Sequence, residues 1–148
     1  MPEAGYSGTP LPRKLGIRED SLLLVEGPPA PVAPGDDAAE LMAALPGLRA
    51  AGPAELTGGG LDVVVLFSTA REHLAARFGP LAAALAPAGG LWVAYPKKAA
   101  KVPTDLDFGV VQGIGLEAGL VDNKSCAVSH IWSGVRFVIR LADRPGRA

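Results

Sequence analysis

The chain has 148 residues, of which 49% are hydrophobic and 20% are charged. This length and composition fit one globular domain with a hydrophobic core and exclude a chain that is disordered as a whole. A formal net charge of −1 and a pI near 6.1 give no overall electrostatic reason to bind nucleic acid. No apolar run is long enough to span a bilayer and no secretory signal precedes the domain, so we expect a cytoplasmic protein without a membrane or nucleic-acid partner.

Residues 1–20 are expected to form an N-terminal arm that packs on the domain. Leu11 to Ile17 could form one helical turn that Gly16 closes. Four apolar residues between Ser21 and Glu26 then predict a short buried strand, which stops at the Gly-Pro-Pro sequence of residues 27–29.

A short helix is predicted next, from Ala38 to Leu45, with Asp36 or Asp37 as its N-cap. A weak second strand is expected between Leu48 and Leu56, where a Gly-Pro pair interrupts the pattern.

The second half of the chain has clearer patterns. Leu61 to Phe67 is a continuous apolar run of the kind found in strands that are covered on both faces. A helix is expected to follow, because Thr69 and Glu72 have capping-box spacing. Its buried stripe would consist of Leu74, Phe78, Leu81 and Leu85, with a kink at Gly79-Pro80 and an end at Pro87 and Gly89-Gly90.

The most apolar strand is predicted at Leu91 to Tyr95. Thr104 and Asp107 repeat the capping-box spacing before a third helix that ends at Gly119. A weak strand from Lys124 to Ser129, a turn over residues 130–134 and an alternating strand from Val135 to Leu141 would close the chain as an antiparallel hairpin.

Alternating strands and helices predict an α/β fold: a small Rossmann-like three-layer α/β/α domain with a mostly parallel sheet and a C-terminal antiparallel hairpin. This single domain would span residues 21–143, and residues 144–148 would form a disordered tail.

From Leu61 onward, the order of elements resembles the latter half of class I methyltransferases, including the Leu-Ala-Pro-Ala-Gly-Gly-Leu sequence at residues 85–91. In that family, a glycine-rich turn after the first strand lets backbone amides approach S-adenosylmethionine. Here the corresponding residues are Glu26-Gly27-Pro28-Pro29, and two prolines remove two donors. The resemblance therefore implies the architecture more strongly than it implies methyl transfer.

Several segments also look like a family of small bacterial proteins that is catalogued as a domain of unknown function. They are residues 6–11, 14–17, 91–98, 102–106, 121–124 and 132–137. This resemblance implies a single cytoplasmic domain and brings no activity, substrate or catalytic residue with it. The stretch from residue 28 to residue 60 fits that family least well.

Lys97 and Lys98 follow the most apolar strand, where ligands of open parallel sheets bind. Together with the start of the helix that Thr104 would cap, and with Asp105, they could hold a carboxylate or phosphate; alternatively, they are solvated loop lysines. Asp122, Asn123 and Lys124 could lie at the same edge of the sheet, but they are more typical of a turn.

Other reactive residue types form no recognisable catalytic set. Ser68 and Thr69 have no base nearby in the sequence, and His73 and His130 favour solvated positions. Cys126 has no partner at metal-ligand spacing, so we expect a reduced, inert thiol, no metal site and no cofactor.

The leading hypothesis is therefore a non-catalytic or accessory protein that binds a small anionic ligand, or a protein partner, at the carboxyl edge of the sheet. One alternative is a group-transfer enzyme with a methyltransferase-like scaffold that acts on a nucleotide- or acyl-bearing substrate, with Lys97, Lys98 and Asp122 stabilising charge. Another is a homodimer whose function is assembly.

Overall fold

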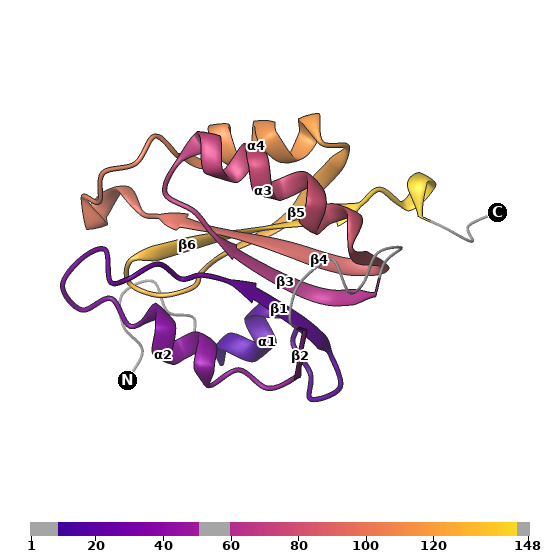
Figure 1. Cartoon of the computed structure of the whole chain (residues 1–148), viewed down its shortest axis with the longest axis horizontal. Helices are drawn as coiled ribbons and strands as arrows, with labels where there is room; N and C mark the ends of the chain where they lie inside the picture. Colours follow the sequence, from indigo (N-terminus) through magenta and orange to yellow (C-terminus); the bar gives the residue numbers. More distant parts are fainter. Residues whose placement is uncertain (1–8, 51–59, 145–148) are drawn as a thin grey trace.

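The computed structural model describes residues 9–50 and 60–144, which form a sheet of six strands between two layers of helices (Figure 1). The strands are β1 (Leu22–Glu26), β2 (Leu48–Arg49), β3 (Leu61–Phe67), β4 (Leu85–Pro96), β5 (Leu120–Ala127) and β6 (Trp132–Ile139), in the spatial order β2-β1-β3-β4-β6-β5. β6 pairs antiparallel with both of its neighbours, β4 and β5, and the other pairs of adjacent strands are parallel. The predicted fold class, a mostly parallel sheet with a C-terminal antiparallel hairpin, is confirmed.

Helices cover both faces of the sheet. The short helices α1 (Leu11–Leu15) and α2 (Ala38–Ala43) lie on one face, and α3 (Arg71–Ala83) and α4 (Phe108–Glu117) lie on the other (Figure 1). Short 3₁₀ turns occur at Lys98–Ala100 and Leu141–Asp143. Within the described residues, none of these helices has the length and hydrophobicity needed to cross a membrane.

Each face of the sheet has its own hydrophobic core. Alternate residues of β3 point to opposite faces, so Val64 and Leu66 join the core under α3 and α4, whereas Val63 and Val65 join the core beside α1 and α2. Edge-to-face aromatic pairs occur in both cores. Phe78 lies 5.2 Å from Phe137 in the first, and Phe67 lies 5.0 Å from Trp132 in the second, measured between ring centroids.

The described part of the N-terminal segment, from residue 9 onward, lies against the sheet. Helix α1 ends at Gly16 in a left-handed conformation, with a φ of 76°. Leu15 and Ile17 are buried, and the carbonyl of Leu15 accepts a hydrogen bond of 3.0 Å from the indole of Trp92. The segment therefore packs on the domain. Residues 1–8, the expected continuation of β2 after residue 50, and the tail from residue 145 lie outside the described residues.

Strand β4 is longer than the sequence pattern predicts. It begins at Leu85 instead of Leu91, so Pro87 and Gly89-Gly90 lie within the strand and do not simply end a helix. A Cβ atom at Gly89 would stand 2.5 Å from the carbonyl oxygen of Leu61. Glycine is therefore needed where β4 crosses close to β3, and its role here is close backbone approach.

The C-terminal hairpin also differs from its predicted boundaries. Strand β5 begins at Leu120, so the turn favoured for Asp122, Asn123 and Lys124 is wrong: these residues lie inside the strand. The pairing of β5 with β6 shifts register between Asp122 and Lys124, as expected for a bulge. This irregularity explains why the segment has the composition of a turn.

Candidate functional site

The carboxyl ends of three parallel strands lie along one edge of the sheet. β1 pairs with β3, and β3 pairs with β4, all in parallel, so Glu26, Phe67 and Pro96 end their strands on the same side. Two cavities at this edge are described below. We call the one between β1 and β3 the β1–β3 cavity, and the one after β4 the lysine cavity.

The lysine cavity has a volume of about 450 Å³ and combines cationic, aromatic and hydroxyl groups. It is lined by Tyr95, Pro96, Lys97, Lys98, Asp107, Phe108, Gly109 and Ser133. The backbone amide of Lys97 donates a 2.8 Å hydrogen bond to the carbonyl of Ile131, which fixes the start of this loop. Burial lowers the pKa of Lys97, and the charge of Lys14 lowers it further. Lys98 is exposed, and the Phe108 ring is 44% exposed.

Thr104 and Asp105 connect two loops at this edge and do not line the lysine cavity. The Thr104 hydroxyl donates to the carbonyl of Thr69 at 2.6 Å, and Asp105 accepts a 2.7 Å hydrogen bond from the amide of Arg71, the first residue of α3. The loop before α4 therefore supports the β3–α3 turn and supplies the cap of α3 from a distant part of the chain.

Both predicted capping boxes are consequently wrong. Ala70 is the N-cap residue of α3 and makes no side-chain cap, because Asp105 provides the acceptor that Thr69 was expected to provide. The N-cap of α4 is Asp107, whose carboxylate accepts a 2.8 Å hydrogen bond from the amide of Val110. Thr104 does not cap that helix: its hydroxyl donates to the carbonyl of Thr69 and accepts from the amide of Leu106, which precedes the helix.

Asp122, Asn123 and Lys124 do not meet the lysines of this cavity. Asp122 faces Phe137 in the register of the hairpin, and Phe137 faces Leu91, well before the carboxyl end of β4. Its carboxylate accepts a 3.2 Å hydrogen bond from Gln112 on α4. The Lys124 ammonium instead donates to the carbonyl of Lys14 at 3.2 Å. Of the seven predicted site residues, only Lys97 and Lys98 line the lysine cavity.

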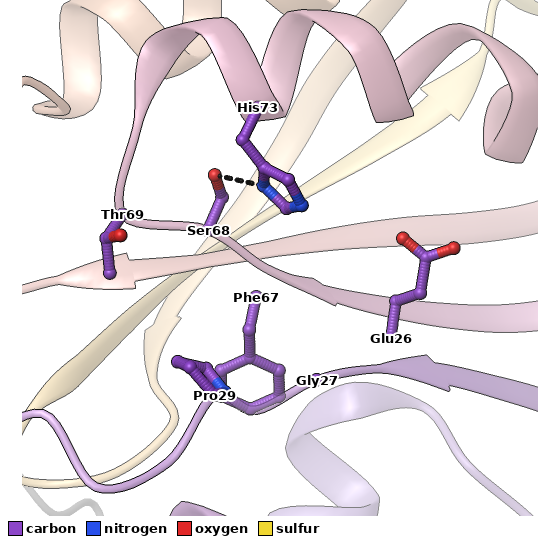
Figure 2. A pocket seen from close by; sticks show the side chains of 7 residues that line it. All are labelled: Glu26, Gly27, Pro29, Phe67, Ser68, Thr69 and His73. Carbon is purple, nitrogen blue, oxygen red and sulfur yellow. Dashed lines mark hydrogen bonds between the residues drawn. The ribbon is translucent and has the colours of Figure 1, made fainter.

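The β1–β3 cavity has a volume of about 350 Å³ and is lined by Glu26, Gly27, Pro29, Phe67, Ser68, Thr69 and His73 (Figure 2). Ser68 lies at the end of β3 and His73 in the first turns of α3, and their side chains meet with 2.8 Å between Oγ and Nδ1. The Ser68 hydroxyl also lies 3.1 Å from the carbonyl of Ala70, a second acceptor for its proton.

The sequence pattern missed this Ser68–His73 pair. The two residues are five positions apart, across a turn from strand to helix, and this turn brings them face to face. A serine directly after a strand, with a histidine in the first turn of the next helix, was the available signal. Ser68 is only 2% exposed, whereas His73 is exposed.

Glu26 faces the same cavity but is already paired. The Arg77 side chain donates two hydrogen bonds to its carboxylate, of 2.9 and 2.5 Å, and this contact raises the pKa of Arg77. Gly27 has a φ of 88°, and a Cβ atom there would lie 2.9 Å from Cβ of Phe67. Glycine is therefore required for the loop after β1 to pass over Phe67.

Comparison with solved structures shows that this fold resembles the fold of class I methyltransferases. The chain is similar to a putative type 11 methyltransferase from Sulfolobus solfataricus, with a TM-score of 0.55, 10% identity, and coverage of 93% of this chain and 95% of that one. A TehB-like SAM-dependent methyltransferase from Corynebacterium glutamicum gives a TM-score of 0.51, 10% identity, and coverage of 93% and 91%. The Methanococcus jannaschii fibrillarin pre-rRNA processing protein gives a TM-score of 0.51 and 14% identity, with coverage of 88% of this chain and 69% of that one.

These identities show the fold alone. Several other matching chains are longer, and this chain spans about half of their length. No family model matches the sequence, and no curated protein matches it. The resemblance to a bacterial domain of unknown function therefore stays a prediction.

Proposed function

We propose that this protein is a non-catalytic or accessory member of the methyltransferase-like α/β fold, and that it binds a small anionic ligand in the lysine cavity. The observation that carries the proposal is the position of Lys97: its ammonium is partly desolvated at the carboxyl end of β4, beside Lys98 and a cavity of about 450 Å³. A bound anion would offset both the desolvation of Lys97 and its repulsion from Lys14.

The ring of Phe108 and the hydroxyls of Tyr95 and Ser133 suit a ligand with an apolar body and an anionic group. Ligand cavities commonly combine an apolar lining with a few polar groups that fix orientation. Asp107 is the one carboxylate that lines this cavity among the described residues, and it is engaged in capping α4. Its charge disfavours an anion close to the helix start, so we place the anionic group nearer to the lysines.

The residues of the β1–β3 cavity do not fit S-adenosylmethionine, which the fold family suggests as a cofactor. Pro28 and Pro29 have no amide hydrogen to donate, and the space beside Gly27 is filled by Phe67. The Glu26 carboxylate is held by Arg77 and is not free for a ligand amine or hydroxyl. We therefore derive no methyl transfer for this chain.

A thermal-shift screen of carboxylates, phosphates and nucleotides tests the proposal. A ligand at a hundredfold excess over its Kd adds about 2.7 kcal/mol to the free energy of unfolding. For ligands with an apolar body and an anionic group, we expect the shift to disappear in a K97Q/K98Q variant and to persist in K101Q, which removes a charge from an exposed lysine that does not line the cavity. Equal shifts in both variants would place the ligand elsewhere.

The Ser68–His73 pair favours a second candidate function, acyl transfer in the β1–β3 cavity. A serine hydroxyl within hydrogen-bond reach of an imidazole is the arrangement that nucleophilic catalysis requires. Low exposure of Ser68, and a neighbouring carbonyl that competes for its proton, argue against it.

Hydrolysis of p-nitrophenyl acetate separates the two candidates. Acyl transfer requires a burst or turnover that S68A and H73Q each abolish while the fold is retained. A rate equal to that of free imidazole in solution, unchanged in S68A, would reject it and leave ligand binding as the proposed function.

A further inference from the structure

A second group of cations lies on the sheet itself, away from the lysine cavity. Arg136 of β6 is directly opposite Trp92 of β4 and Lys124 of β5 in the strand register. Directly opposite residues share a face of the sheet. This is the face on which α1 packs, because the indole of Trp92 donates to the carbonyl of Leu15.

Gly90 makes room for the Arg136 guanidinium. A Cβ atom at Gly90 would stand 2.3 Å from Nε and 2.7 Å from Cζ of Arg136. The guanidinium therefore lies flat against β4 and is half-buried instead of extending into solvent. A charged group held in this way loses hydration, which must be offset by a partner.

Within the described part of the chain, the hydrogen-bond partner of this arginine is neutral. Arg136 donates to the amide oxygen of Asn123 at 3.4 Å, a long hydrogen bond, and Arg144 donates to the carbonyl of Ile139 at 3.2 Å. Burial lowers the pKa of Arg136, and the nearby charge of Arg144 lowers it further. In residues 9–50 and 60–144, the one salt bridge is that of Arg77 with Glu26, so no described carboxylate neutralises these two guanidinium groups.

We infer that Arg136 and Arg144 form a binding site for an oxyanion, the phosphate or carboxylate group of a small ligand. Arg144 is anchored at the carbonyl of Ile139, three residues along β6 from Arg136, and two guanidinium groups give planar, charge-assisted donors that match the oxygens of such a group. Asn123 can add its amide donors from the bulge of β5. Lys97 lies seven positions beyond Gly90, roughly 23 Å along the strand direction, so this site is independent of the lysine cavity.

Titration with inorganic phosphate, pyrophosphate and citrate, each at constant ionic strength adjusted with chloride, tests this inference by thermal shift. We expect one or more of these anions to stabilise the wild-type protein. A larger thermal shift with pyrophosphate than with phosphate would indicate a phosphate-bearing ligand. A larger shift with citrate than with either would indicate a polycarboxylate.

Substitutions test whether the anion-dependent thermal shift depends on Arg136 and Arg144. R136Q and R144Q should each reduce the anion-dependent shift at least several-fold, and R136K should restore it only in part, because an ammonium lacks the planar fork. R140Q removes the same charge from an exposed arginine between them and should keep the shift. K97Q/K98Q should keep it as well, which separates this site from the proposed function.

The absence of any anion-dependent shift in the wild-type protein would overturn the inference, as would an equal shift in R136Q, R144Q and R140Q. If R136Q fails to fold, the comparison of R144Q with R140Q tests the inference alone. Arg144 lies after the last strand, so its substitution should leave the sheet intact.

Discussion

Replacing Gly115 with alanine tests how closely α4 packs on the sheet, and α4 carries Phe108 and Gly109 of the lysine cavity. Within an exposed helix, changing glycine to alanine stabilises the protein by about 1 kcal/mol. Gly115 is instead buried, and its new Cβ would lie 2.1 Å from Cε2 and 2.4 Å from Cδ2 of Phe137. Phe137 is fully buried and meets Phe78 edge to face, so it has little room to move.

Overpacking of this kind costs about 1–3 kcal/mol. Gly113 is the matched control: it lies in the same helix and is exposed, and a Cβ atom there meets nothing within 4 Å. We therefore expect the free energy of unfolding of G115A to fall about 1–3 kcal/mol below that of G113A, measured by denaturant titration. Equal stabilities would refute the close contact between α4 and β6.

Three further predictions concern other parts of the carboxyl edge and hairpin. D105A should lower the free energy of unfolding by about 1 kcal/mol in a denaturant titration, because the amide of Arg71 loses its cap acceptor; no change would show that solvent replaces it. Alkylation of Cys126 should have a pH midpoint above that of an unfolded thiol, since burial raises its pKa; a lower midpoint would contradict this. Burial lowers the pKa of Lys97, so the unfolded state binds more protons between that lowered pKa and the ordinary value of about 10.4. Stability should therefore rise with pH across this window in the wild type and rise less in K97M, whereas identical slopes would show that Lys97 is not desolvated.

The fold could be predicted because its strongest patterns are local. The continuous apolar run at Leu61–Phe67 and the alternation of the last strand depend only on which faces are buried. Strand boundaries depend on non-local pairing, and there the prediction failed. Leu85 joins β4 because it pairs with Leu61, and the segment around Asn123 joins β5 because β6 lies beside it.

The candidate site was predictable only in part for the same reason. Lys97 follows a strand directly, so its position at the carboxyl edge follows from local order. The roles of Thr104 and Asp105 depend on contacts with Thr69 and Arg71, more than thirty residues away. Capping-box spacing cannot reveal that a helix receives its cap from another loop.

The site of ligand binding can be located most directly by following backbone amide NMR shifts while the most stabilising anion of the thermal-shift screen is added. If the lysine cavity binds it, the largest shifts should fall on Lys97, Lys98 and Gly109, with little change at Gly27 and Ser68. The largest shifts at Gly27 and Ser68 would instead show that the ligand binds in the β1–β3 cavity, and this would contradict the proposed function.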